Sequence, residues 1–248
     1  MKIGGVQLRA VAGDVAGNAT KHLKCIEGAA SQGVDLVFFP ELSLTGYEPR
    51  LAKSLATSQD DHRLDIFQRH SESHSIIIGL GLPLSVGTDV QVGMVWFVPN
   101  EPRRSYAKQQ LHSDEVPFFV AGNTSLVLEA GVHKLAPAIC HESLQPSHAD
   151  NAARLGADVY LASVAKPAGP LAKAVVHYPA IARRHSMYIV MADCVGPSDD
   201  FVSVGQSAVW NNHGDLLAQM DGESEGIVIL DTVSGKATIH GITFDGAC

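Results

Sequence analysis

The sequence predicts an α/β fold with two β-sheets, and three observations support this prediction. Apolar runs typical of strands alternate with segments of helical periodicity. Strands outnumber helices, which favours two packed sheets over one doubly wound sheet. No low-complexity stretch, linker or internal repeat of about 20 to 50 residues divides the 248 residues. We therefore expect residues 1–248 to form a single domain.

The expected strands are short apolar runs separated by turn residues. Residues 2–8 open the chain as a strand, and the wholly apolar run 34–39 is typical of a buried strand. Residues 207–210 and 216–219 flank the loop Asn-Asn-His-Gly, which predicts a hairpin. The other expected strands are residues 76–79, 92–98, 126–128, 135–139, 159–164, 188–192 and 227–230.

A smaller set of segments has the pattern of helices. These candidates are residues 20–32, 60–70, 149–155 and 171–186. The first is expected to end at Gly33. Ser147, followed three residues later by Asp150, indicates a helix start before the third candidate. Pro179 is expected to break or kink the last one, because proline removes a helical hydrogen bond.

Composition and charge exclude several classes of protein. Lys and Arg number 18 against 26 Asp and Glu, which gives a formal net charge of −8. An acidic chain lacks the basic surface of nucleic-acid binders and is not attracted to anionic membranes. No run of about 18 apolar residues predicts a transmembrane helix. The N-terminus enters a strand without a signal-peptide core, so we expect a cytoplasmic protein with no membrane or nucleic-acid partner.

The cysteines and histidines do not form a metal-binding motif. The four cysteines are Cys25, Cys140, Cys194 and Cys248. They are scattered, and we expect most of them to be small buried apolar side chains. Twelve histidines suggest a metallohydrolase as an alternative, but His141-Glu142 and His148 lack the HExxH spacing of a zinc site. We therefore expect no metal and no cofactor.

Three chemically reactive side chains follow short apolar runs. Glu41 comes just after the run 34–39, and Cys140 comes directly after the run 135–139. Lys108 follows the short segment that holds Tyr106 and Ala107. Ligand sites in open α/β sheets lie beyond the carboxyl ends of the strands. The sequence therefore indicates one site that combines a carboxylate, an ammonium group and a thiol.

This combination can cleave a carbonyl compound through a covalent intermediate. A cysteine attacks a carbonyl carbon as a thiolate. A carboxylate in a poorly solvated site has a raised pKa and accepts protons near neutral pH. A lysine beside both groups favours the thiolate and stabilises the developing oxyanion. The same base can then protonate a leaving amine and activate water against the thioester.

The segments that contain these residues resemble the signature motifs of the nitrilase superfamily, the carbon–nitrogen hydrolases. Residues 38–47 read FFPELSLTGY and resemble the glutamate motif of that family. Residues 106–111, YAKQQL, resemble its lysine motif, and residues 138–143, AICHES, resemble its nucleophile motif. The order Glu, Lys, Cys also matches, and the resemblance covers nearly the whole chain.

The resemblance implies a specific fold and a specific set of catalytic groups. The family fold is a four-layer α-β-β-α sandwich that pairs through a helical face, so we expect a homodimer. Glu41 would be the general base and acid, Lys108 would stabilise the oxyanion, and Cys140 would form the thioester. The substrate would be a small-molecule amide or N-carbamoyl compound.

The resemblance also indicates residues that would contact the substrate. Glu115 matches a second family glutamate, which would orient Lys108 and help position the substrate. The backbone N–H of His141 would supply a second oxyanion donor. We also expect Tyr47, His141 and Glu142 to touch the substrate.

Other functions remain open at this stage. A nitrilase proper would share the three residues and split a C≡N bond, although His141 stands where true nitrilases usually have Trp. Cys194 stands where Asn or Arg is more usual in the family. A binding protein that keeps the fold without catalysis is a further alternative. The acyl group and the leaving group of the substrate stay undetermined.

Overall fold

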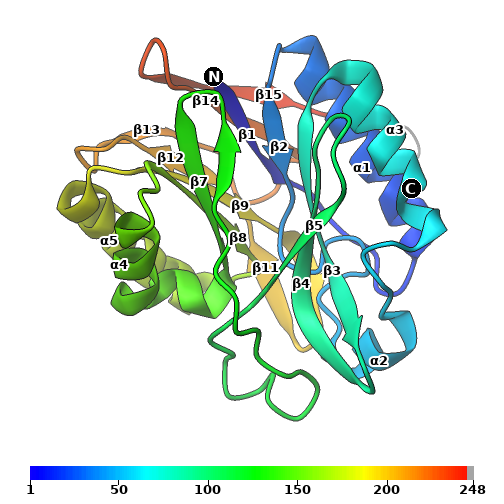
Figure 1. The fold of residues 1–248 in the computed structure, drawn as a ribbon. Helices are drawn as coiled ribbons and strands as arrows, with labels where there is room; N and C mark the ends of the chain where they lie inside the picture. Colours follow the sequence, from blue (N-terminus) through cyan, green and yellow to red (C-terminus); the bar gives the residue numbers. More distant parts are fainter. Residues whose placement is uncertain (245–248) are drawn as a thin grey trace.

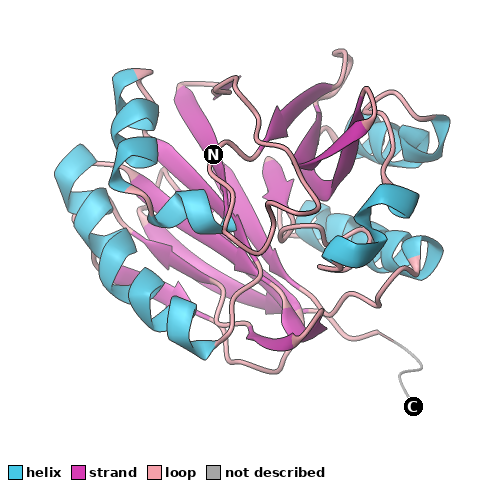
Figure 2. Ribbon diagram, turned by 90° about the horizontal axis from the view of Figure 1, so that it is seen from below, coloured by secondary structure: helices cyan, strands magenta, loops and turns pink. Residues whose placement is uncertain are grey.

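The computed structural model describes residues 1–244 and has two sheets packed face to face. The first sheet has the strand order β15-β14-β1-β2-β3-β4-β5, and the second has the order β13-β12-β9-β8-β7-β6. A separate pair, β10 and β11, runs antiparallel. Figures 1 and 2 show both sheets enclosed between helices, with α1 and α3 outside the first sheet and α4 and α5 outside the second. The expected four-layer α-β-β-α sandwich is therefore confirmed.

The strands carry most of the buried apolar side chains. Strands of the first sheet are β1 (Lys2–Gln7), β2 (Leu36–Phe38), β3 (Ile77–Val86), β4 (Asp89–Phe97), β5 (Arg104–Ala107), β14 (Gly226–Asp231) and β15 (Lys236–Gly241). Strands of the second sheet are β6 (Leu128–Ala130), β7 (His133–Ile139), β8 (Val159–Val164), β9 (Tyr188–Asp193), β12 (Ala208–Trp210) and β13 (Leu216–Gln219). The remaining pair is β10 (Val195–Ser198) and β11 (Phe201–Val204).

Parallel pairing is confined to the centre of each sheet. In the first sheet β1, β2 and β3 run parallel, and in the second sheet β7, β8 and β9 do. The central strands of a parallel sheet are buried on both faces, which explains their near-continuous apolar sequences. Their carboxyl ends bring loops from both sheets to the same region of the molecule.

Three apolar clusters separate the four layers. One lies between the sheets and includes Phe38, Trp96 and Leu161. A second packs the first sheet against α1 (Val15–Ser31) and α3 (Asp65–His74). A third packs the second sheet against α4 (Pro146–Arg154) and α5 (Ala168–His185). Each sheet thus buries one face against its partner and the other against helices, which is the usual solution for sheets apolar on both faces.

Helix boundaries differ from the sequence predictions at identifiable residues. Helix α1 begins five residues early, at Val15, because Asp14 accepts a hydrogen bond from the Gly17 N–H at 3.0 Å and caps the helix. The start indicated by Ser147 is wrong, because Pro146 takes the first position of α4. Helix α5 continues through Pro179 without the expected break. The helical segments η1 (Pro49–Leu51), α2 (Ala52–Leu55) and η3 (Cys140–Leu144) were not predicted. The helix expected over residues 60–70 is divided between η2 (His62–Leu64) and α3.

The strands β3 and β4 are longer than their apolar patterns indicate. They form an extended antiparallel hairpin from Ile78 paired with Phe97 to Val86 paired with Asp89. Glycines inside this hairpin permit close contacts. A Cβ atom on Gly81 would lie 2.3 Å from the carbonyl oxygen of Pro40 and 2.9 Å from the Leu42 nitrogen. Gly81 therefore lets the turn that carries Glu41 pack directly on the sheet.

We expect Gly81→Ala to lower the free energy of unfolding by about 1–3 kcal/mol, because the new methyl group must displace the Pro40 backbone. Urea unfolding measures this change. Gly169→Ala is the matched control, since a Cβ there meets nothing within 4 Å in the first turn of α5, and its stability should be equal or slightly higher. Equal unfolding curves for wild type and Gly81→Ala would contradict the packing argument.

Candidate active site

The thiol of Cys140 lies at the carboxyl end of β7. Cys140 has φ = 44°, in the left-handed region that non-glycine residues seldom occupy. Its backbone therefore turns sharply from the strand into η3. Its Sγ donates a hydrogen bond to the Ala165 carbonyl at 3.6 Å, and its own carbonyl accepts one from Ser143 Oγ at 2.6 Å. The turn holds the sulfur at the boundary between strand end and cavity.

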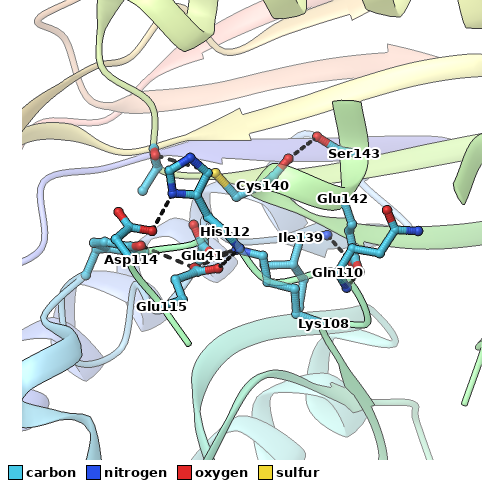
Figure 3. A network of polar contacts seen from close by, with 12 residues as sticks. Glu41, Lys108, Gln110, His112, Asp114, Glu115, Ile139, Cys140, Glu142 and Ser143 are labelled. Carbon is cyan, nitrogen blue, oxygen red and sulfur yellow. Dashed lines mark hydrogen bonds and ion pairs between the residues drawn. The ribbon is translucent and has the colours of Figure 1, made fainter. Parts of the chain in front are cut away.

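Lys108 forms two buried ion pairs beside this thiol. Its Nζ donates to Glu41 Oε1 at 2.7 Å and to Glu115 Oε1 at 2.6 Å, as Figure 3 shows. The side chains of all three residues are at most 1% exposed. A charge buried to this degree is tolerated only when it is paired. The structure thus brings together Glu41, Lys108, Glu115 and Cys140, which the sequence predicted to share a site.

Two further groups fix the position of Glu115. The Tyr47 hydroxyl donates to Glu115 Oε1 at 3.2 Å, and the His112 backbone N–H donates to Oε2 at 2.7 Å. Glu115 is therefore held at both carboxylate oxygens. Since Lys108 Nζ also binds Oε1, this carboxylate limits the directions in which the ammonium group can point. Tyr47 acts on Lys108 through Glu115.

Burial gives the carboxyl group of Glu41 the properties of a base near neutral pH. Burial raises the pKa of Glu41, the ammonium group of Lys108 opposes that change, and the carboxylate of Glu115 adds to it, leaving a pKa of about 7. Glu41 Oε2 has no hydrogen-bond partner among the described residues, whereas Oε1 is held by Lys108. One carboxylate oxygen is thus available to accept a proton.

The pKa of the Cys140 thiol shows that the thiol and the neighbouring ammonium group are not a preformed thiolate–ammonium ion pair. Burial and then the charge of Glu41 raise the pKa of the Cys140 thiol to about 12, against the lowering effect of Lys166 and Lys108. Burial lowers the pKa of Lys108, but Glu41, Cys140 and Glu115 together raise it above its usual value. Lys108 is therefore a permanent cation, while Cys140 is a thiol at neutral pH that needs a base to become nucleophilic.

These groups face a cavity of about 400 Å³. Tyr47, Lys108, Glu115, Cys140 and His141 all line it. The His141 ring lies 5.1 Å from the His112 ring, and its Nε2 lies 3.1 Å from Gln145 Nε2. Other lining groups are Asp114, Lys166, Lys173 and His177. The cavity is large enough for a small organic molecule.

Glu142 lies away from this cavity, in contrast to the expected contact with substrate. Its side chain is fully buried and accepts hydrogen bonds from the Tyr106 hydroxyl at 2.7 Å and the Ile139 N–H at 2.8 Å. The Gln109 N–H adds a third bond at 2.6 Å. Glu142 therefore ties the segment after β5 to the end of β7. It fixes the backbones that carry Lys108 and Cys140.

Lys166 and Asp193 belong to the same region and were missed by the sequence analysis. Lys166 lies two residues beyond β8, and its Nζ is 3.7 Å from Cys140 Sγ. Asp193 ends β9, and its Oδ1 accepts the Lys166 backbone N–H at 3.0 Å. Burial raises the pKa of Asp193 well above its usual value. Both residues lie at the ends of apolar strands, as Cys140 does, so the same sequence signal marks them.

The described cysteines and histidines show no further reactive cluster. Cys25 and Cys194 are buried free thiols, as expected, and Cys248 lies outside the described residues. Within residues 1–244 no three His, Cys, Asp or Glu side chains are grouped to hold a metal ion. His148, one of the histidines considered for a metal, instead contacts the hydroxyls of Tyr106 and Tyr160.

Within residues 1–244 no helix combines the length and apolarity needed to cross a membrane.

Comparisons with known proteins agree with the resemblance seen in the sequence motifs. The family model described as carbon–nitrogen hydrolase matches residues 2–238. A glutamine-dependent NAD(+) synthetase of Aquifex aeolicus is 27% identical over 93% of this chain, but the match covers 42% of the synthetase, so the chain spans less than half of that relative. A nitrilase of Pyrococcus abyssi is 28% identical over 84% of this chain and 80% of its own length.

The solved structures share the fold. A mutant amidase from Nesterenkonia sp. AN1, showing covalent addition of the acetamide moiety of fluoroacetamide at its active site cysteine, superposes with a TM-score of 0.85. The match covers 92% of this chain and 89% of the amidase at 23% identity.

Proposed function

The chain belongs to the carbon–nitrogen hydrolase family, and we propose that it hydrolyses a non-peptide C–N bond in a small carboxamide or N-carbamoyl compound. The observation that carries this proposal is the buried Lys108 between two carboxylates, in the wall of the cavity that also holds the Cys140 thiol. One free carboxylate oxygen, one fixed cation and one thiol are the groups that acyl transfer through a thioester requires.

In the acylation step Glu41 takes the proton of the Cys140 thiol. The sulfur forms a bond to the carbonyl carbon of the amide, and the π-electron pair moves onto the carbonyl oxygen. Lys108 stabilises this negative charge, and the backbone N–H of His141 is the proposed second donor. The C–N bond then breaks, and the leaving nitrogen takes the proton from Glu41.

In the deacylation step Glu41 acts again as the base. It takes a proton from water, and the water oxygen attacks the thioester carbon. The C–S bond breaks, the carboxylic acid product leaves, and the sulfur recovers its proton from Glu41. Glu115 keeps Lys108 in place through both steps, since it holds the ammonium group at 2.6 Å. Tyr47 and the His141 ring are proposed contacts of the substrate, because both line the cavity.

Several features guide the choice of substrates. Lys173 brings a cation to the cavity lining, which favours an amide that also bears a carboxylate. Burial lowers the pKa of His177, which lines the same cavity as a neutral ring. Glutamine enters the panel because synthetases that depend on it are relatives, and short aliphatic amides enter because an amidase shares the fold. Nitrile hydrolysis is the second candidate, since a nitrilase is among the relatives. A silent binding protein is the remaining alternative.

A homodimer is a further proposal, and it rests on family resemblance. Val175 and Val176 on the outer face of α5 are 40% and 74% exposed, so this helix offers apolar surface to a second copy. Light scattering should give twice the chain mass of 26.3 kDa; a monomer at micromolar concentration would contradict the proposal.

A cytoplasmic location also stays a prediction, which cell fractionation of the native host would test.

We expect wild-type protein to release ammonia from at least one member of a panel of ω-amides, aliphatic amides, N-carbamoyl amino acids and nitriles. Cys140→Ala should lose at least about 10³-fold in kcat/KM, because no other group can form the thioester. Cys25→Ala, which removes a buried thiol outside the cavity, is the control and should keep its activity. Turnover by Cys140→Ala equal to wild type would refute the mechanism.

The pKa of Glu41 also predicts the pH dependence of the reaction. Since the base must be ionised, kcat/KM should fall about tenfold per pH unit below a pKa of about 7. Glu115→Gln removes a carboxylate that raises this pKa, so it should move the acid limb to lower pH. Glu101→Gln, at an exposed site, should leave the limb in place. An acid limb that stays fixed or moves upward in Glu115→Gln would contradict Glu41 as the base.

A further inference from the structure

Lys166 provides a second buried ammonium group at the candidate nucleophile. It lies two residues beyond β8, and its Nζ is 3.7 Å from Cys140 Sγ and 3.4 Å from the Cys140 carbonyl oxygen. Lys166 is 1% exposed and lines the same cavity as Cys140. Lys108 reaches that cavity from the end of β5, in the other sheet. The thiol thus lies between ammonium groups supplied by both sheets.

The two lysines differ in the partners of their charges. Lys108 Nζ contacts Glu41 and Glu115, so its charge is shared by two carboxylates. Within residues 1–244 no carboxylate oxygen lies within 4.0 Å of Lys166 Nζ, and its hydrogen-bond partners are the sulfur and carbonyl oxygen of Cys140. A buried ammonium group without a carboxylate is costly unless another negative charge compensates it. A thiolate on Cys140 would be that charge.

The backbone of Lys166 is held on both sides. Its N–H donates to Asp193 Oδ1 at 3.0 Å, and its carbonyl accepts the Val204 N–H at 3.0 Å. The neighbouring Ala165 carbonyl accepts the Cys140 thiol. The segment after β8 is therefore fixed by β9 and β11, and it presents both a thiol acceptor and a cation to the sulfur. A group this well anchored is already in place when the charge forms.

We propose that Lys166 is a second catalytic lysine, whose ammonium group stabilises negative charge on Cys140 Sγ while Lys108 serves the carbonyl oxygen. This inference rests on the proposed function, since it takes Cys140 as the nucleophile. Lys166 transfers no proton: Glu41 passes the thiol proton to the leaving nitrogen and later gives the sulfur a proton taken from water. The charge of Lys166 acts before the C–S bond forms and again when that bond breaks and the sulfur leaves with the electron pair.

The pKa shifts of Cys140 and Lys166 agree with these separate roles of the two lysines. Among the charges that lower the pKa of the Cys140 thiol, Lys166 has the largest effect and Lys108 follows. Burial lowers the pKa of Lys166, and Cys140 is the first of the groups that raise it above its usual value. Other titratable groups that influence this lysine or the thiol are Glu41, Asp193, His177 and Tyr178. Lys166 remains charged across neutral pH in their presence.

The test is the pH profile of Cys140 alkylation by iodoacetamide, with the modified cysteine identified by peptide mass mapping. Lys166→Met should raise the apparent pKa of Cys140 by at least one unit, which slows alkylation at neutral pH at least tenfold. It should also lower kcat at least tenfold with KM within about threefold. Lys166→Arg keeps the charge, so its profile should stay within about half a pH unit of wild type.

Lys236→Met removes an exposed lysine of β15 and is the matched control, with an expected profile equal to wild type. A folded Lys166→Met with an unchanged profile overturns the proposal, as does an equal shift in the Met and Arg variants. If Lys166→Met does not fold, a shift of one unit or more in Lys166→Arg overturns it alone. Alkylation needs no substrate, so this result is independent of turnover by Cys140→Ala, which tests the proposed function itself.

Discussion

The ion network of Lys108 with Glu41 and Glu115 is the interaction on which the site depends. One ammonium group and two carboxylates are buried together, with Nζ–O distances of 2.7 and 2.6 Å. Removing Lys108 would leave two buried carboxylates without a cation, and breaking a buried pair in this way typically costs about 3–5 kcal/mol. Burial raises the pKa of Glu41, and the charge of Glu115 adds to this effect, so that the pKa is about 7 despite the opposing charge of Lys108. The same three side chains therefore hold the site together and set the basicity of Glu41.

The two-sheet architecture assembles this network from distant parts of the chain. Glu41 and Lys108 come from strand ends of the first sheet, and Cys140 and Lys166 come from strand ends of the second. Close approach of the sheets makes this convergence feasible. A Cβ atom on Gly5 of β1 would lie 3.2 Å from the Met191 carbonyl of β9. The fully buried Glu142 connects the segment after β5 to the end of β7 by hydrogen bonds, and this fixes the backbones next to Lys108 and Cys140.

Sequence patterns predicted the site residues that lie at strand ends and within local motifs. Glu41, Lys108 and Cys140 follow apolar runs within recognisable motifs. In the structure Lys108 and Cys140 line one cavity, and Glu41 contacts Lys108. The role of Glu142 could not be predicted, because two of its partners, the N–H groups of Gln109 and Gln110, lie 33 and 32 residues away along the chain.

Long-range contacts also explain the other differences between prediction and structure. Lys166 follows an apolar strand, so the sequence can mark it as a strand-end residue, but its contact with Cys140 depends on the fold. The length of β3 was underestimated because Gly79 and Gly81 look like turn residues. In the structure they make room for the Trp96 ring and the Pro40 backbone. Local signals therefore give the element types and the motif residues, whereas tertiary packing decides element lengths and the supporting contacts.

We propose that the Glu41–Lys108–Glu115 network makes Cys140 a nucleophile that forms a thioester. The decisive measurement is intact-mass analysis of Glu41→Gln after it is mixed with an amide that wild type hydrolyses and the reaction is quenched rapidly. Wild type and Cys140→Ala are measured in parallel. We expect wild type to form an acyl adduct that peptide mapping locates on Cys140. In Glu41→Gln this adduct should form much more slowly. Turnover with acylation of another residue, or an adduct that forms in Glu41→Gln as fast as in wild type, would contradict it.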